Sequence, residues 1–468
     1  MSKEIVIIGG GPGGYTAAIY ASQMGAKVCL VERDRIGGTC LNRGCIPTKA
    51  LVASASLLQK IRMAKNFGIE VEGVRPNIGD MFARKEKIVS LLRKGIEALI
   101  KRNRVEIIKG HATLTPDKEV VVRGEEGDRR MKGSHIIVAV GSRSRSLPHI
   151  DFDGKHILSS TDLLEMEKVP ESIVIIGGGV IGCEFAYILS SLGCKVIILE
   201  ALDRLLPIKS IDPMCSRLLL REFKKARIGV HLKTLVQRVV VKPGGGVQVV
   251  FSQGEGEEIK EIAAEKVALC VGRAPVLEIE EMEKVGISTY GGGWLEVDET
   301  LMTSRDDIYA IGDCLGPKRP MLAHVASHEA IAVVSSLLQG RGGVDYLNTP
   351  SVVYTEPEIG CVGLSEEMVR ERGIPYECVS VLFRSLGRSH TSSDISGEAK
   401  LIFDTRDKKV LGIHIVGAHA SELVATGGVL LKKNATITEI KHTIFAHPTF
   451  SEIFHEASLK ALGTPLHG

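Results

Sequence analysis

The sequence predicts an α/β protein in which two βαβ units of one design precede a C-terminal α+β region. Three observations support this fold class. A strand, glycine turn, helix and strand occur in series twice, and strands and helices alternate differently from about residue 349. The chain has 468 residues, which at roughly 150 residues per domain suggests about three domains. The 25% of charged and 44% of hydrophobic residues are typical of a globular protein.

The first βαβ unit is predicted at the N-terminus. Residues 5–8 have the pattern of a buried strand, and a glycine turn with Gly9, Gly11 and Gly14 leads into a helical stretch and a second strand that ends at Glu32. In such a turn the first glycine makes the tight bend, the second admits a pyrophosphate to the backbone, and the third lets the helix pack on the strand. The acid at the end of the second strand accepts hydrogen bonds from a ribose hydroxyl.

The same series returns 168 positions later, from residue 173, with Gly177, Gly179 and Gly182 and a strand that ends at Glu200. A single Gly-x-Gly-x-x-Gly is expected about 0.6 times by chance in a chain with this glycine content. Here both copies follow a strand pattern, and both have an acid 18 positions after the last glycine. Two such sites predict two different dinucleotides, one FAD and the other NAD.

The acids at the two ribose positions argue against a 2′-phosphate at either site. Arg204 follows Glu200 closely and leaves NADP open as an alternative, although no basic residue occupies the acid position itself. NAD is therefore the prediction for the second site.

The remaining elements follow from periodicity and turn residues. A helix with a solvated, charged face is expected over residues 83–102. Strands are expected at 105–108, 120–122, 136–140, 379–383, 399–403 and 410–416, turns at 124–128, 243–246 and 291–294, and C-terminal helices at 365–372 and 422–432. The first lobe closes near Ser142 and the second ends near residues 267–275. The predicted domain boundaries are 1–148, 149–278, 279–348 and 349–468.

A pair of cysteines, Cys40 and Cys45, lies between Gly37 and Lys49, shortly after the first unit. Spacing alone is moderate evidence for a redox pair, since about 0.2 such pairs are expected by chance. The pair also lies at the start of a predicted helix, whose positive N-terminus favours a thiolate, and four intervening residues allow disulfide contact. The alternative is that Cys40 and Cys45 are buried structural cysteines. We interpret four other cysteines as structural in this sense: Cys29, Cys183, Cys194 and Cys270.

With this loop, three further motifs carry a family resemblance: Ile-Tyr-Ala-Ile-Gly-Asp at 308–313, Met-Leu-Ala-His at 321–324 and Ala-His-Pro-Thr-Phe-Ser-Glu at 446–452. Over essentially its whole length the sequence resembles the pyridine nucleotide disulfide oxidoreductases, and within them most closely the dihydrolipoamide dehydrogenases. The resemblance implies a FAD-binding domain in two parts, a NAD-binding domain between them and a C-terminal dimerisation domain.

The resemblance also implies site residues. The positions that match FAD contacts are Gly9, Gly11, Gly14, Glu32, Gly38, Thr39, Lys49, Gly110, Ser142, Asp313, Met321, Leu322, Ala323 and His324. Those that match the NAD side are Gly177, Gly179, Gly182, Glu184, Glu200, Val236 and Gly272. In the family Lys49 and Glu184 pair beside the flavin. Glu184 also directly follows a glycine turn, so an ordinary helix position is its alternative interpretation.

His447 is the candidate acid/base and Glu452 its carboxylate partner. Thr449 and Glu452 also have the spacing of a capping box, so Glu452 could serve only the start of a helix. Both roles are compatible, because a box that fixes the helix also fixes the pair. In the family the histidine serves the disulfide of the other subunit, which implies an obligate homodimer.

Other features of the sequence give weaker evidence about function. His324 and His328 have the spacing of metal ligands on a helix but lack a third ligand nearby, so no metal is expected. The remaining histidines and Arg129-Arg130 are expected on the solvated surface. Arg43 and Phe450 depart from the family pattern, where a small apolar residue and a leucine are commoner, and could alter the thiol pKa and the substrate channel.

The implied activity is oxidation of protein-bound dihydrolipoamide to lipoamide with reduction of NAD+, by electron transfer from Cys40 and Cys45 through FAD. The implied partners are a second copy of the chain and the lipoyl domains of a 2-oxo acid dehydrogenase or glycine cleavage complex. A mercuric reductase would need a C-terminal cysteine pair, whereas the last cysteine is Cys378, and a glutathione reductase would use NADPH. Another disulfide, a quinone, or a non-catalytic flavoprotein subunit remain alternatives.

Overall fold

A computed structural model describes residues 3–125, 127–254, 258–277 and 279–467 of the chain. These residues divide into two compact units. The first consists of residues 3–50, 79–145 and 272–346, and the second of 51–78, 146–271 and 347–467.

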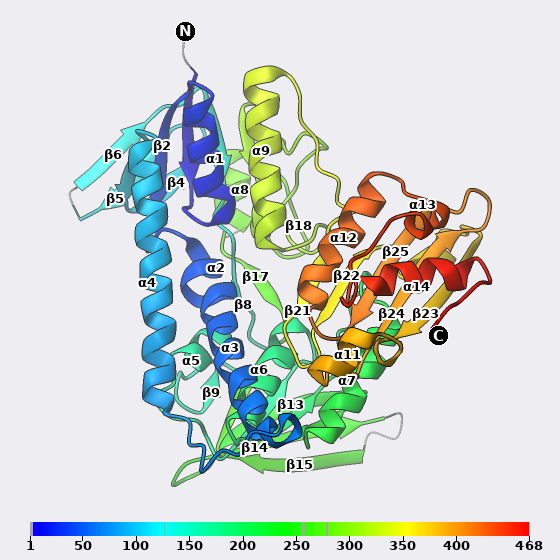
Figure 1. Cartoon of the computed structure of the whole chain (residues 1–468). Helices are drawn as coiled ribbons and strands as arrows, with labels where there is room; N and C mark the ends of the chain where they lie inside the picture. Colours follow the sequence, from blue (N-terminus) through cyan, green and yellow to red (C-terminus); the bar gives the residue numbers. More distant parts are fainter. Residues whose placement is uncertain (1–2, 126, 255–257, 278, 468) are drawn as a thin grey trace. The chain divides into compact units, whose positions relative to one another are not determined.

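The first unit is built on a five-stranded parallel sheet (Figure 1). Its strands in spatial order are β20 (Ile308–Ala310), β7 (His135–Val138), β1 (Glu4–Ile8), β2 (Lys27–Glu32) and β3 (Glu106–Lys109). Ile5, Ile7 and Leu30 are fully buried, as expected for a parallel sheet covered on both faces. The predicted strands at 5–8, 105–108 and 136–140 are confirmed to within two residues.

The helices of this unit include α1 (Pro12–Gln23), α2 (Gly38–Arg43), α4 (Ile78–Arg102), α8 (Ile279–Val285) and α9 (Ala323–Gln339), and α3 (Cys45–Arg62) continues beyond the unit. Figure 1 shows α1 and α9 side by side, and they pack together closely. Helix α4 has the expected charged, largely exposed surface, with Val89 and Ile100 buried. A small antiparallel sheet of β4 (His111–Leu114), β5 (Val120–Gly124) and β6 (Gly127–Met131) includes the predicted strand and turn at 120–128, of which residue 126 lies outside the described residues.

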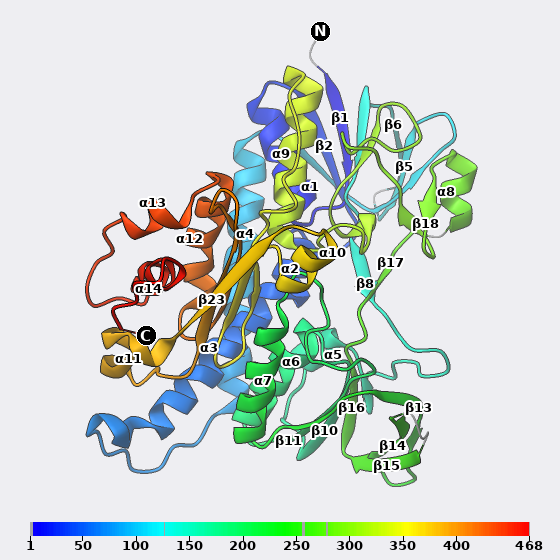
Figure 2. The same cartoon turned by 90° about the vertical axis from the view of Figure 1, so that its right-hand side faces the viewer.

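The second unit repeats the parallel design. Its sheet has the order β12 (Gly229–His231), β11 (Lys195–Leu199), β10 (Ser172–Ile176), β16 (Lys266–Leu269) and β9 (Ile157–Leu158). Strands β10, β11 and β16 correspond in order to β1, β2 and β7, and helix α6 (Val180–Ser191) to α1. Helix α7 (Pro213–Lys225) follows β11. Figure 2 shows a hairpin sheet beside β16, formed by β13 (Thr234–Val241), β14 (Val247–Gln253) and β15 (Glu258–Ala264).

The C-terminal part of the second unit is an antiparallel sheet with helices on its faces. The strand order is β21 (Ser351–Val353), β22 (Ile359–Gly363), β25 (Val410–Val416), β24 (Glu398–Asp404) and β23 (Tyr376–Leu382). Helices α12 (Ala420–Lys432) and α14 (Glu452–Ala461) pack on one face, and α7 also contacts β25. The remaining helices are α5 (Ser160–Leu164), α10 (Glu366–Glu371), α11 (Gly387–Ser392) and α13 (Ile437–Lys441). The predicted α+β character of this region is confirmed.

In the described ranges, the helices are all too short or too polar to traverse a lipid bilayer. The expected hairpin turns at 243–246 and 291–294 connect β13 to β14 and β18 (Thr289–Tyr290) to β19 (Trp294–Leu295). The four predicted domain boundaries stay a prediction.

Candidate functional site

The glycine turn of the first unit leaves no room for side chains where a pyrophosphate would approach. Gly9 has φ of +106°, and a Cβ on Gly14 would lie 1.7 Å from the Gly9 carbonyl oxygen. A Cβ on Gly38, at the start of α2, would lie 2.6 Å from the Cα of Gly11. These glycines therefore bring two backbone segments and the N-terminus of α1 together, which is the geometry that binds a dinucleotide pyrophosphate.

Glu32 ends β2 beside this turn. Its carboxylate accepts hydrogen bonds from the Gly10 N–H at 2.6 Å and from the Asp34 N–H at 2.8 Å. Burial is the largest influence on Glu32 and raises its pKa, while the Gly10 N–H opposes this effect. The backbone thus fixes the carboxylate where the sequence predicts a ribose contact.

A second group in this unit connects Asp313 with Ser142, the first residue of β8 (Ser142–Ser144). Ser142 Oγ donates to Asp313 Oδ2 at 2.7 Å, and Arg273 donates to the Ser142 carbonyl at 2.6 Å and lies 3.4 Å from Asp313 Oδ2. Burial lowers the pKa of Arg273, and the charges of Asp313 and Cys45 oppose this effect. Every residue predicted to contact FAD lies in this unit.

Arg273 and Glu329 were missed by the sequence analysis as members of this site. Glu329 is 1% exposed and accepts from the Gly312 N–H at 2.6 Å and from Tyr346 at 2.7 Å, so it fixes the turn that carries Asp313. Glu329 lies one helical turn after Val325 on α9 and belongs to no recognised sequence motif. A carboxylate within an otherwise apolar helix was the available signal.

The cysteine loop has a break where one continuous helix start was expected. Cys40 lies in α2, and Cys45 is the first residue of α3, with Gly44 between the two helices. The Cys40 and Cys45 thiols contact each other, and this contact and burial raise the pKa of Cys40, whereas the charge of Lys49 lowers it. Cys45 is exposed and Cys40 is partly exposed, so the pair differs from the buried cysteines of the described residues.

Arg43, which departs from the family pattern in this loop, forms an ion pair with Asp34. Its effect on the thiol pKa stays a prediction. Phe450 is 6% exposed and packs against Phe383 and His419 in the core of the C-terminal sheet. Its ring fills this part of the core, and its effect on the substrate channel stays a prediction.

The glycine turn of the second unit repeats the geometry of the first. Gly177 has φ of +106°, and a Cβ on Gly182 would lie 2.0 Å from the Gly177 carbonyl oxygen. Glu200 accepts from the Gly178 N–H at 2.6 Å and from the Leu202 N–H at 2.8 Å. A second dinucleotide cradle therefore exists, with its ribose acid held by the same two backbone contacts.

Arg204 is engaged away from this acid. Its guanidinium donates to the Ile211 carbonyl at 3.1 Å and the Ile208 carbonyl at 3.4 Å, and it lies 3.1 Å from Glu367. Because these partners occupy the guanidinium, Arg204 is not arranged to neutralise a 2′-phosphate. This geometry favours NAD over NADP.

Other residues predicted for the NAD side have mixed outcomes. Glu184 is 3% exposed and accepts from the Tyr354 N–H at 3.0 Å, so its carboxylate is held inside the second unit. Val236 lies on β13 in the same unit, whereas Gly272, with φ of +101°, begins a segment of the first. The pairing of Glu184 with Lys49 of the first unit stays a prediction.

His447 and Glu452 form the predicted pair. The Nδ1 atom of His447 lies 2.9 Å from Glu452 Oε1, and Oε2 of the same carboxylate accepts from the Thr449 N–H at 2.9 Å. Burial raises the pKa of Glu452, but the Thr449 N–H and His447 outweigh it and lower the pKa. The imidazole is 75% exposed, so its Nε2 side can reach a substrate.

The capping box predicted at Thr449 forms only in part. Helix α14 begins at Glu452 after Ser451, and Thr449 Oγ1 donates to the Ala446 carbonyl at 2.7 Å instead of capping the helix. Glu452 nevertheless combines both predicted roles, because one oxygen holds the histidine and the other holds the backbone of the preceding turn.

Two sequence interpretations of single residues need correction. His414 is fully buried, not on the solvated surface, because it lies on the central strand β25 under α7. Cys29 is partly exposed, whereas Cys183, Cys194 and Cys270 are buried as expected.

Comparison with known proteins decides the family. The model of the pyridine nucleotide-disulphide oxidoreductases matches residues 3–330, and the model of the dimerisation domain of these proteins matches residues 349–458. The chain belongs to this family. FAD and NAD are its cofactors, and the two glycine cradles with their backbone-held acids fit them.

Relatives align along nearly the whole chain. A mitochondrial dihydrolipoyl dehydrogenase of Dictyostelium discoideum is 37% identical over 470 residues, covering 99% of this chain and 95% of that protein. A dihydrolipoamide dehydrogenase of Chaetomium thermophilum is 38% identical, covering 99% and 92%. The crystal structure of LpdA from Mycobacterium tuberculosis has a TM-score of 0.90 at 26% identity, covering 98% of this chain and 99% of that one.

Proposed function

We propose that this protein is a dihydrolipoyl dehydrogenase: it oxidises a protein-bound dihydrolipoyl group to the cyclic disulfide and reduces NAD+. The observation that carries the proposal is the accessible contact between Cys40 and Cys45 in the unit that holds the first dinucleotide cradle. Nearly full-length relatives with that activity in their names support the choice of substrate.

The thiol chemistry follows from the residues. One substrate thiol gives its proton to His447 of the partner subunit, and the resulting thiolate attacks Cys40 Sγ of a Cys40–Cys45 disulfide, which forms a mixed disulfide and releases Cys45 as a thiolate. The second substrate sulfur attacks the first, which completes the lipoyl disulfide and frees Cys40. The substrate has then lost two electrons and two protons to the cysteine pair and its surroundings.

Bound FAD supplies the two-electron path from the cysteine pair to a hydride on NAD+. This chain's residues place the reactants. The cradle at Gly9–Gly14 and Glu32 would hold one dinucleotide, and Glu200 would bind the ribose of the other. The contact from Glu452 keeps the His447 Nδ1 proton in place, so that Nε2 is free to accept a proton from the substrate.

The test is steady-state reduction of NAD+ by dihydrolipoamide with the purified flavoprotein, with NADP+ and reduced glutathione as alternative substrates. We expect turnover with NAD+ and dihydrolipoamide, and a kcat/KM for NADP+ at least about 100-fold lower, because Glu200 repels a 2′-phosphate. Flavin reduction by NADH without turnover of dihydrolipoamide would contradict the proposed substrate and indicate another disulfide, a quinone or a non-catalytic role.

We further propose a homodimer and a lipoyl-domain partner. The dimerisation-domain match supports the homodimer, and Ile444, 97% exposed in the C-terminal part, offers an apolar contact. Sedimentation at micromolar concentration should give about twice the 50.5 kDa chain mass. The cytoplasmic location is proposed from the scattered cysteines, and the relative from Dictyostelium discoideum is mitochondrial by name.

A further inference from the structure

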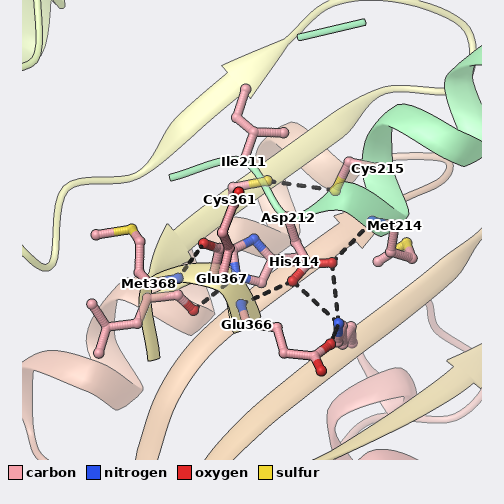
Figure 3. Close-up of polar contacts among 12 residues, drawn as sticks. Ile211, Asp212, Met214, Cys215, Cys361, Glu366, Glu367, Met368 and His414 are labelled. Carbon is pink, nitrogen blue, oxygen red and sulfur yellow. Dashed lines mark hydrogen bonds and ion pairs between the residues drawn. The ribbon is translucent and has the colours of Figure 1, made fainter. Parts of the chain in front are cut away.

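A second group of two cysteines and a histidine lies far from the redox loop in sequence. Cys215 lies in the first turn of α7, Cys361 on β22 and His414 on β25. The two Sγ atoms are 3.7 Å apart, and the ligand atoms of all three residues lie within 4.8 Å of one another (Figure 3). The three side chains are between 0 and 2% exposed.

The sheet register explains why these residues meet. Cys361 and His414 are direct partners across β22 and β25, and His414 is also the direct partner of Lys400 on β24. Residues opposite one another on adjacent strands share a face of the sheet. Their neighbours Val362 and Ile413 point to the face covered by α12, so this polar row points to the other face, where α7 brings Cys215 against it.

The imidazole of His414 is arranged as a ligand. Its Nε2 lies 3.0 Å from the Leu364 carbonyl oxygen, which can only accept, so Nε2 carries the proton. The Nδ1 atom is buried and has no hydrogen-bond partner among the described residues. A histidine that donates one N–H to a carbonyl and directs its other nitrogen toward two sulfurs has the arrangement found in metal sites.

The distances suit a single ion. Two sulfurs that each lie ~2.3 Å from one metal ion are about 3.8–4.0 Å apart at tetrahedral to trigonal angles. The observed separation of 3.7 Å is close to this range and well above a covalent S–S bond, which is about 2.05 Å long. Two sulfurs and one imidazole nitrogen are ligands that favour Cu⁺ and Zn²⁺.

Asp212 is 0% exposed and lies close enough to His414 for their charges to interact. Asp212 itself is occupied by the Met214 N–H, the Glu366 N–H and Lys400, so it supports the group without serving as a fourth ligand.

We infer that Cys215, Cys361 and His414 form a buried site for one thiophilic metal ion, held between α7 and the C-terminal sheet. Three ligands favour Cu⁺, since structural Zn²⁺ is almost always four-coordinate. Binding forms two metal–sulfur bonds and one metal–nitrogen bond, and the two protons displaced from the group leave to solvent, with no change of oxidation state. The ion would link two segments of the second unit that are 146 residues apart.

The first test measures metal in the holoenzyme after expression with added copper or zinc and anaerobic purification. Wild-type protein should hold about one more ion of Cu⁺ or Zn²⁺ per FAD than Cys361→Ser. Cys378→Ser should hold as many ions per FAD as wild type. Cys378 is an exposed cysteine on β23 and is the matched control. The Cys40–Cys45 pair is present in all three proteins, so any metal bound to this pair adds equally to each measured metal content. Equal metal in wild type and Cys361→Ser would overturn the inference.

A second measurement does not depend on the variant folding. X-ray absorption at the metal edge of wild-type protein should give two sulfurs at about 2.2–2.3 Å and one imidazole nitrogen at about 2.0 Å. Loading should also raise the melting temperature of wild type and Cys378→Ser, because an ion that binds only the folded state stabilises it. A Cys215–Cys361 disulfide in non-reducing peptide maps, or a metal without imidazole, would contradict the site.

Discussion

Cys40 and Cys45 lie in an accessible segment with four residues between them, whereas Cys215 and Cys361 lie in the core and come from distant segments. The candidate histidines differ in the same way. His447 is exposed and bonds a carboxylate through Nδ1, while His414 is buried and bonds a backbone carbonyl through Nε2. The same residue types are therefore in two opposite environments in one chain.

This difference separates two kinds of chemistry. A carboxylate partner stabilises the imidazolium, so His447 is suited to take up and return a proton at a surface that substrate can reach. A carbonyl partner fixes Nε2 of His414 as the hydrogen-bond donor and leaves Nδ1 directed at the two sulfurs. Substrate access and the hydrogen-bond partner, not the residue types, decide which pair does redox work.

The largest expected effect tests the exposed pair. Cys45→Ser should lower turnover of dihydrolipoamide by at least about 10³-fold, because the pair that receives the electrons is lost. It should also remove the long-wavelength thiolate–flavin absorption on two-electron reduction. Cys378→Ser should keep the wild-type rate. A Cys45→Ser protein that retains this absorption would show that Cys45 is not the thiolate beside the flavin.

The next effect tests the exposed histidine. His447→Gln should lower kcat by about 10²–10⁴-fold, the usual contribution of a positioned acid/base. The variant should also lose the limb of the pH–rate profile that reports this group, while its FAD content and melting temperature stay near wild type because the imidazole is 75% exposed. Unchanged pH dependence would assign His447 a structural role.

A smaller effect tests Asp212, the buried carboxylate beside the group of Cys215, Cys361 and His414. Asp212 is 0% exposed and bonds two backbone N–H groups and Lys400. Asp212→Asn should destabilise the protein by about 3 kcal/mol, because an amide cannot accept all three contacts and leaves the lysine charge less compensated. Guanidinium unfolding followed by far-UV circular dichroism measures this loss. The matched control is Asp407→Asn, whose ion pair with Lys409 is at the surface and should leave the midpoint unchanged.

The smallest effect is the pH dependence of the same carboxyl. Burial raises the pKa of Asp212, but the charge of His414, the two N–H groups and Lys400 outweigh it and lower the pKa. A carboxyl whose pKa is lower in the folded state stabilises the protein above the unfolded pKa of about 3.9, and this stabilisation is lost as the pH falls through the folded value. The stability difference between wild type and Asp212→Asn should therefore be constant from about pH 5 to 7 and shrink below pH 4. A difference that grows on acidification would contradict this sign.

The exposed site could be predicted from the sequence because its parts are local. Each glycine turn, the Cys40–Cys45 loop and the His447–Glu452 pair lie within short segments whose spacing fixes their geometry. The ribose acids at Glu32 and Glu200 were predicted for the same reason, and the structure places both against their glycine turns.

The buried group could not be predicted in this way. Cys361 and His414 meet only through the register of two strands that are 53 positions apart (361 to 414), and Cys215 joins them from a helix before either strand. A histidine within an apolar strand, Ile413-His414-Ile415, was the one local signal that it is buried. Arg273 was missed because only the fold brings it to Ser142 and Asp313.

The contacts of Asp212 have a consequence for how separable the C-terminal domain is. One carboxylate precedes α7, bonds the first turn of α10 and pairs with Lys400 of β24. A fragment cut at residue 349, where the dimerisation-domain model begins, lacks this carboxylate and exposes the polar row to solvent. Exchange of this domain between relatives should therefore succeed only when residues 212–225 are exchanged with it, because the set of residues that pack together extends beyond residues 349–458.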